Sequence, residues 1–272
     1  MIDLHTHILP GVDDGLQNAG EALLLAEEAA AQGVTTMVAT PHLYWGARPA
    51  LSAAQIREGV EELNRLIQAK GTPLTVVPGC EIPLTADPLP HLLRGEWMSL
   101  GDSGCAVLVE SSWEGWSASN TATVRSLLDA GWTVVLAHPE RHAHFQQDLS
   151  LLEELVQMGV HLQVTSSSLL PGKASPAVAR CAYELMERRM VSVVASDCHD
   201  LKRRRCDLGE AAELIRRSYG PHVARMLTAT APRALLRCER IERQQVWQHV
   251  PEGESAWKRL LRTVLRRQTD DG

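Results

Sequence analysis

Residues 1–15 read MIDLHTHILPGVDDG, and this stretch joins a short apolar strand pattern to a dense set of ionisable side chains. His5 and His7 are separated by one residue, and Asp13 and Asp14 follow them. Side chains at positions i and i+2 of an extended strand point to the same side, so the two imidazoles can bind one ion together. The opening segment therefore predicts a first strand that ends in a metal-binding loop.

Short runs rich in β-branched residues recur along the chain, separated by Ala-, Leu- and Glu-rich stretches such as 20–32 and 174–189. The predicted strands are 2–4, 34–39, 74–77, 106–110, 133–137, 161–165 and 191–195. Four helical stretches stop at a glycine before a strand, as expected of helix C-caps: Gly33, Gly71, Gly131 and Gly159. Repeated strand–helix alternation predicts a parallel sheet, and seven such units favour a closed barrel in a single α/β domain.

Ionisable side chains follow most of these strands. In a parallel barrel the carboxyl ends of all strands open on one face, where active sites form. The candidates after the first strand are His42 in ATPH, Glu81 in GCE, Glu110 in VLVE, His138 and Arg141 in AHPER, and Asp197 and His199 in ASDCH. Imidazoles and carboxylates together suit Mn²⁺, Fe²⁺ or Zn²⁺. Because these donors exceed the needs of one ion, we expect two or three ions that share a bridging carboxylate and generate a hydroxide nucleophile.

Composition limits the class of protein. The 272 residues include 27 Lys+Arg and 33 Asp+Glu, and the net charge of −6 argues against a nucleic-acid binder. The six cysteines form no CxxC pair, which predicts reduced thiols in a cytoplasmic protein. The polar residues at positions 3, 5 and 7 are not typical of a signal peptide, and no apolar run approaches the roughly 20 residues that span a bilayer.

The motifs HTHILPGVDDG, ATPH, GCE, VLVE, AHPER and ASDCH resemble the PHP (polymerase and histidinol phosphatase) superfamily. Within it, the chain is similar to the CpsB/CapC-type tyrosine-protein phosphatases of bacterial polysaccharide operons, from residue 1 to about residue 237. The resemblance implies a distorted (β/α)7 barrel with a trinuclear metal centre, most naturally of Mn²⁺. It also implies a phosphotyrosine segment of a bacterial tyrosine kinase of exopolysaccharide or capsule synthesis as the substrate.

The resemblance further implies a role for each motif residue. The first ion would be held by His5, His7, Glu81 and Asp197, the second by Glu81, Glu110 and His138, and the third by Asp14, His42 and His199. Arg141 and Arg204 would bind phosphate, since an arginine fork donates two parallel hydrogen bonds to a phosphate dianion. The run KRRR leaves Arg203 and Arg205 as alternatives to Arg204. Asp13 is expected to support the site or shape the turn.

Other functions compete with this one. Cys198 and Arg204 have the C-x5-R spacing of cysteine-based tyrosine phosphatases, but no glycine lies between them to let the backbone wrap a phosphate. We therefore interpret the spacing as coincidence and Cys198 as a packing residue. The same metal site could serve a small phosphomonoester, such as a sugar or histidinol phosphate, or a phosphodiester. A metal-stabilised interaction module without catalysis is a third hypothesis.

Two regions outside the metal motifs carry aromatic or basic patterns. The segment SSWEGWSASN (111–120) places two tryptophans near the mouth, either packed on a helix or forming a wall for an aromatic phosphoester. We expect the main domain to cover 1–250 and a basic amphipathic helix or tail to cover 251–272. Residues 257–268 could dock on their own domain, on a twin subunit in a homo-oligomer, or on an anionic membrane surface.

Overall fold

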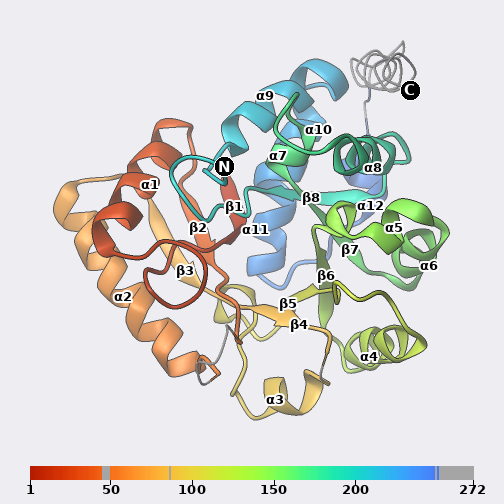
Figure 1. The fold of residues 1–272 in the computed structure, drawn as a ribbon, viewed down its shortest axis with the longest axis horizontal. Coiled ribbons are helices and arrows are strands. Elements are labelled where there is room, and N and C mark those ends of the chain that lie inside the picture. The colour runs from red at the N-terminus through yellow and green to blue at the C-terminus, as the bar shows by residue number, and fades with distance from the viewer. Residues whose placement is uncertain (45–49, 86, 249, 251–272) are drawn as a thin grey trace.

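A computed structural model of the chain describes residues 1–44, 50–85, 87–248 and 250, and its elements are shown in Figure 1. The strands are β1 (Ile2–Thr6), β2 (Thr36–Ala39), β3 (Thr75–Pro78), β4 (Glu81–Pro83), β5 (Ala106–Glu110), β6 (Thr133–Ala137), β7 (His161–Thr165) and β8 (Val191–Ala195). The predicted tail helix, 257–268, lies outside the described residues.

The strands form two parallel sheets, in the orders β1-β2-β3 and β4-β5-β6-β7-β8. Two isolated bridges join the sheets, one between Thr6 and Cys198 and one between His42 and Glu81. The His7 amide also donates to the Cys198 carbonyl at 2.9 Å, and the Glu81 amide donates to the Pro41 carbonyl at 3.1 Å. These two seams close a distorted parallel barrel, which confirms the predicted α/β barrel architecture.

The third predicted strand, 74–77, corresponds to β3, which pairs with β2. A further short strand, β4, follows after Gly79 and Cys80 and pairs with β5 instead. A Cβ at Gly79 would lie 3.0 Å from Val38 Cγ1, so the close approach of this segment to β2 favours glycine. Strand β4 was not predicted, and it places Glu81 at the mouth of the barrel.

Helices follow the strands and cover the outside of the barrel. In Figure 1, α1 and α2 lie outside β1–β3, and α4, α5, α6 and α8 lie around β5–β8. The helices are α1 (Ala19–Ala31), α2 (Ala53–Lys70), α3 (Leu89–Leu93), α4 (Ala118–Asp129), α5 (Ala143–Gln147), α6 (Ser150–Met158), α7 (Ser166–Leu169), α8 (Pro176–Glu187), α9 (Leu208–Tyr219), α10 (Pro221–Arg225), α11 (Ala231–Leu236) and α12 (Arg243–Val246), with short turns η1 (Leu100–Asp102), η2 (Pro139–Arg141) and η3 (Met226–Thr230). Among the described residues, no helix has the length and apolar character needed to cross a bilayer.

Local sequence signals explain where several helices begin and end. The side chains of Asn18, Ser52 and Ser117 accept hydrogen bonds from the first turns of α1, α2 and α4. The four glycines predicted to end helices all have positive φ: Gly33, Gly71, Gly131 and Gly159. The predicted C-caps are therefore confirmed, because glycine takes this left-handed conformation without steric cost.

Alternation along the strands divides the apolar residues between two clusters. In β5, Ala106 and Leu108 belong to a smaller cluster between the strands, and Val107 and Val109 belong to the larger cluster under the helices. Leu235 of α11 also belongs to the smaller cluster. Since side chains alternate along a strand, Glu110 shares the inward face of β5 with Leu108. The packing that fills the barrel thus directs this carboxylate toward its open end.

The prediction of six reduced cysteines is wrong for two of them. A disulfide joins Cys105, just before β5, to Cys238, just after α11, with their Cα atoms 5.4 Å apart. The partners are separated by 133 residues, so no local spacing motif reveals the pair. The fold brings them together because α11 returns to the barrel beside the start of β5. Cys80, Cys181, Cys198 and Cys206 are free and buried.

Candidate metal and phosphate site

The ionisable residues that follow the strands meet at the carboxyl ends of the barrel. His5 lies in β1, Glu81 opens β4, Glu110 ends β5, and Asp197 follows β8. A cavity of about 300 Å³ opens there, lined by Asp14, His42, Tyr44, Glu81, Glu110, Trp113, His138, Arg141, Asp197 and Arg204. His5, His7 and His199 lie in donor groups with these residues, so the structure brings together the nine predicted ligands, Arg141 and Arg204.

Four buried side chains form the innermost donor group. The Nε2 atoms of His5 and His7 are 3.2 Å apart. His5 Nε2 lies 3.5 Å from both Glu81 Oε1 and Asp197 Oδ1. His7 Nε2 lies 3.6 Å from Glu81 Oε2 and from Asp197 Oδ1. Donors bonded to one ion at about 2.0–2.2 Å lie roughly 3–4 Å from one another. The spacing of this group therefore fits a single divalent ion.

A second group of donors lies beside the first and shares Glu81 with it. His138 Nε2 is 3.0 Å from Glu81 Oε1 and 3.9 Å from Glu110 Oε1. His142, one turn further along the chain, also has a ring nitrogen within 4.8 Å of donor atoms of Glu110 and His138. Sequence reasoning missed His142, although it directly follows the motif AHPER.

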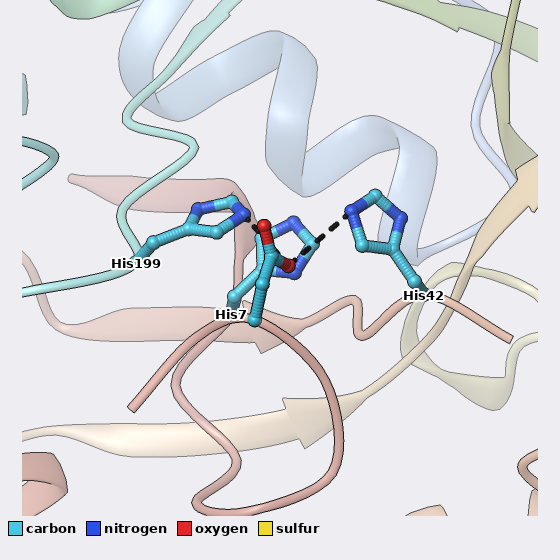
Figure 2. Close-up of side chains that lie close together, drawn as sticks. His7, His42 and His199 are labelled. Atoms are coloured by element: carbon cyan, nitrogen blue, oxygen red, sulfur yellow. Dashed lines mark ion pairs between the residues drawn. The ribbon is translucent and has the colours of Figure 1, made fainter. Parts of the chain in front are cut away.

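The third group surrounds the Asp14 carboxylate, and Figure 2 shows the rings of His7, His42 and His199 gathered at this place. Asp14 Oδ1 lies 3.4 Å from His199 Nε2 and 3.6 Å from His42 Nε2. His42 also links the groups, because its Nδ1 is 3.0 Å from Glu81 Oε2. The predicted third set is thus assembled in the structure, next to the other two.

Supporting hydrogen bonds orient three of the imidazoles. Each ring places Nδ1 against a protein oxygen, so that Nε2 faces the site, an arrangement typical of histidines that bind metals. The pairs are His5 with Gln163 Oε1 at 3.0 Å, His7 with Asp13 Oδ2 at 2.7 Å, and His199 with the Asp197 carbonyl at 2.9 Å. Asp13 thus supports a donor, as expected. Gln163 was not anticipated, because a single glutamine in a predicted strand carries no signal.

Several donor atoms lack any hydrogen-bond partner among the described residues. Buried atoms of this kind are Asp14 Oδ1, Asp197 Oδ1 and His199 Nε2. A buried polar atom left without a partner costs about 1–3 kcal/mol. Divalent cations between these atoms would satisfy them, so the residues present fit a multinuclear metal centre.

The charges of the inner group are strongly perturbed. Burial alone would lower the pKa of His5, but the carboxylates of Glu81 and Asp197 outweigh it and raise that pKa to about 9. Burial alone would raise the pKa of Asp197, but His5 and Arg204 hold it well below its usual range. The carboxylates thus stay ionised and attract positive charge, which is the condition for binding cations.

Two guanidinium groups reach the same edge of the cavity. Arg141 donates to Asp197 Oδ2, and Arg204 Nη2 donates to the same oxygen at 2.7 Å. Arg205 pairs with Glu210 instead, and Arg203 is exposed. Of the three candidates in KRRR, Arg204 is therefore the one whose side chain faces the donors.

Cys198 packs within the larger hydrophobic cluster. Its side chain is fully buried, and burial, with contributions from Cys206 and Asp3, raises the pKa of its thiol well above the usual range. It is not among the residues that line the cavity. A protonated, enclosed thiol is a poor nucleophile, so the geometry does not support cysteine-based catalysis.

The two tryptophans of 111–120 have different environments. Trp116 packs against Phe145, with ring centroids 5.4 Å apart, and its Nε1 donates to Thr121 Oγ1 in α4 at 2.8 Å. Trp113 lines the cavity and is 62% exposed, with its ring stacked on His142 at 4.3 Å. The packing interpretation therefore holds for Trp116, whereas Trp113 forms part of the mouth.

Comparisons with known proteins agree with this geometry. A family described as "Capsular polysaccharide synthesis, CpsB/CapC" matches residues 1–237. Tyrosine-protein phosphatase YwqE of Bacillus subtilis is 34% identical over 90% of this chain and 94% of its own length. Tyrosine-protein phosphatase CpsB of Streptococcus pneumoniae is 30% identical over 87% of this chain and 98% of its own length.

A solved structure has the same architecture. It comes from work on YwqE and CpsB, described as "unique metal-dependent tyrosine phosphatases". The TM-score is 0.85 at 32% identity, over 93% of this chain and all of the other. With the barrel, the donor groups and these matches in agreement, the chain belongs to the CpsB/CapC family.

Proposed function

We propose that this chain is a metal-dependent protein-tyrosine phosphatase that acts on a phosphotyrosine segment of a bacterial tyrosine kinase of exopolysaccharide or capsule synthesis. The observation that carries the proposal is the convergence of three donor groups and two arginines on one cavity. The relatives named tyrosine-protein phosphatases support the substrate class. A cytoplasmic location and contact of 257–268 with a membrane or a twin subunit remain predictions from the sequence.

The donor groups would hold two to three divalent ions. We assign the ligands as His5, His7, Asp14, His42, Glu81, Glu110, His138, Asp197 and His199. Mn²⁺ is our first choice, with Fe²⁺ or Zn²⁺ as alternatives, since each accepts mixed imidazole and carboxylate ligands. When bound, such ions would activate water and stabilise negative charge on phosphoryl oxygens.

Arg141 and Arg204 would hold the phosphate. Both guanidiniums already converge on one carboxylate oxygen of Asp197, so they are positioned to bind an anion together. A phosphate dianion would accept charge-assisted hydrogen bonds from both groups. Donors fixed in this way also stabilise the charge that develops on phosphoryl oxygens in the transition state.

Two aromatic side chains at the rim favour an aromatic ester over a sugar phosphate. Tyr44 is 50% exposed and Trp113 is 62% exposed, although both line the cavity. Neither exposed ring is explained by core packing. A phenyl ring stacked on such a side chain gains about 0.5–1.5 kcal/mol beyond burial of its area. We infer that these rings contact the tyrosine side chain of the substrate.

The test is phosphate release from three substrates by the purified chain: a phosphotyrosine peptide, the same peptide with phosphoserine, and a sugar phosphate. We expect the phosphotyrosine peptide to have the highest kcat/KM, chelation to abolish hydrolysis, and Mn²⁺ to restore it. Elemental analysis should show loss and return of the ions in parallel. Full activity in a preparation shown to be free of metal, or hydrolysis of the sugar phosphate alone, would contradict the proposal.

A further inference from the structure

His142 is a buried histidine that is not one of the nine predicted ligands, and packing in the hydrophobic core does not explain its burial. Its side chain is 0% exposed, yet neither Nδ1 nor Nε2 has a hydrogen-bond partner among the described residues. The nearby His144 differs, because its Nε2 lies 3.2 Å from Ser111 Oγ. An imidazole buried without partners costs free energy, so a missing ligand is a natural explanation for its position.

Some other buried atoms without hydrogen-bond partners among the described residues indicate the class of ligand. Asp197 Oδ1 and His199 Nε2 belong to the donor groups at the mouth, where cations would satisfy them. His142 has the same two properties, complete burial and an unpaired donor atom, and it lies at the edge of the same centre.

The position of the ring fits this explanation. A nitrogen of His142 lies within 4.8 Å of donor atoms of both Glu110 and His138. The ring planes of His138 and His142 are inclined by only 19°, with centroids 5.7 Å apart. Ligands on opposite sides of one ion lie roughly 4–4.4 Å apart, so donor atoms within 4.8 Å of one another need only small movements to reach a common ion.

Trp113 covers the ring from the solvent side. Its indole stacks on His142 with a centroid distance of 4.3 Å and an interplanar angle of 30°. The stacked indole restricts rotation of the imidazole and keeps water from its face. A ligand fixed by packing loses less conformational entropy when it binds than a mobile side chain would.

We propose that His142 is a further ligand of the ion that Glu110 and His138 would hold. The inference rests on the metal centre proposed above and extends it to a residue that the family motifs did not identify. With His142, this ion would have two imidazole ligands, whereas the set of Glu81, Glu110 and His138 offers only one. Nitrogen donors suit Zn²⁺ and Fe²⁺, whereas oxygen donors suit Mn²⁺, so His142 should shift selectivity here away from Mn²⁺.

The test compares the full-length wild type with His142→Phe, which keeps a planar ring but has no nitrogen donor, and with His144→Phe as the matched control. Each metal-free protein is titrated with Zn²⁺ and with Mn²⁺ against a chromophoric chelator, and bound metal is counted by elemental analysis. We expect His142→Phe to weaken one Zn²⁺ site per chain by at least about tenfold, with a smaller loss for Mn²⁺. His144→Phe should match the wild type.

Equal stoichiometry and affinity in His142→Phe and the wild type would overturn the inference while leaving the proposed phosphatase intact. A wild type that binds no divalent ion would overturn the metal centre itself, and the inference with it. Circular dichroism of the metal-free proteins checks that both variants fold. If His142→Phe does not fold, His142→Ala takes its place in the same titration, with His144→Ala as its control.

Discussion

Two regions of the molecule differ in whether their buried polar groups find hydrogen-bond partners within the protein. Asn120, where α4 begins, donates from Nδ2 to the Leu84 carbonyl at 2.8 Å, and its Oδ1 accepts from Ser117 N and Oγ at 2.9 and 2.8 Å. At the mouth, Asp197 Oδ1 is also buried but has no such partner among the described residues. The first region is complete without a ligand, whereas the proposed cations would complete the second. Variants in the two regions should therefore separate stability from activity.

Glu81→Gln should have the largest effect. Glu81 contacts donors in all three groups, and the amide keeps the shape of the side chain but loses its charge. We expect kcat/KM for a phosphotyrosine peptide to fall by about a thousandfold or more, because metal binding supplies several kcal/mol of transition-state stabilisation. Bound metal should fall in elemental analysis while circular dichroism stays native. Wild-type activity at wild-type metal content would remove Glu81 from the site.

Arg204→Ala should come next, with Arg205→Ala as the matched control. Arg204 faces the donors, and Arg205 pairs with Glu210 outside the cavity. Loss of one arginine contact to a phosphate should cost about 2–4 kcal/mol in kcat/KM. Metal content should not change in either variant. Equal kinetics for the two variants would show that the phosphate does not bind where the structure suggests; Arg141→Ala should behave like Arg204→Ala.

Asn120→Ala tests the satisfied region. The change leaves the Leu84 carbonyl unpaired and removes the interaction with Ser117 at the start of α4. We expect the free energy of unfolding to fall by about 1–3 kcal/mol. The kcat/KM measured well below the unfolding temperature should stay within about twofold of wild type. A loss of metal in this variant would show that the two regions are coupled.

Cys198→Ser should have the smallest effect on activity. In a cysteine phosphatase the thiolate attacks phosphorus, so the serine variant would be nearly inactive. Here the thiol is enclosed, and the substitution should keep most of the activity and cost roughly 1 kcal/mol of stability for a buried hydroxyl. Rapid-quench trapping of a phosphocysteine, or a fully metallated but inactive variant, would replace the metal-dependent mechanism with a covalent one.

Much of the fold could be predicted because local signals and tertiary packing agree. Strand patterns, glycine C-caps and ionisable strand ends indicate the same barrel mouth, and the seven predicted strand positions are confirmed. Strand β4 could not be predicted, because this three-residue segment becomes a strand only through its pairing with β5. The Cys105–Cys238 disulfide was missed for a similar reason, as its partners are distant in sequence.

The candidate ligands were predictable because motif spacing reflects strand geometry. Gln163 and His142 were not, because their importance lies in contacts rather than in spacing. Gln163 becomes significant only when its Oε1 is seen 3.0 Å from His5 Nδ1. His142 becomes significant only when both of its nitrogens are found buried and unpaired among the described residues. The backbone at His138 and Asp197 has positive φ, a conformation common at functional sites that no residue preference foretells here.

Because the barrel closes at two seams, the proposed ions would also affect how stably it stays closed. In the part of the chain that the structure describes, each seam has one isolated bridge, between Thr6 and Cys198 or between His42 and Glu81. Ions at the mouth would take ligands from both sheets and so act as cross-links between halves that otherwise meet through few backbone bonds. At a concentration one hundred times Kd, each bound ion would add about 2.7 kcal/mol to the stability of the closed barrel. Amide hydrogen exchange at the two seams should then slow together on metal binding, since neither can open without releasing the ions.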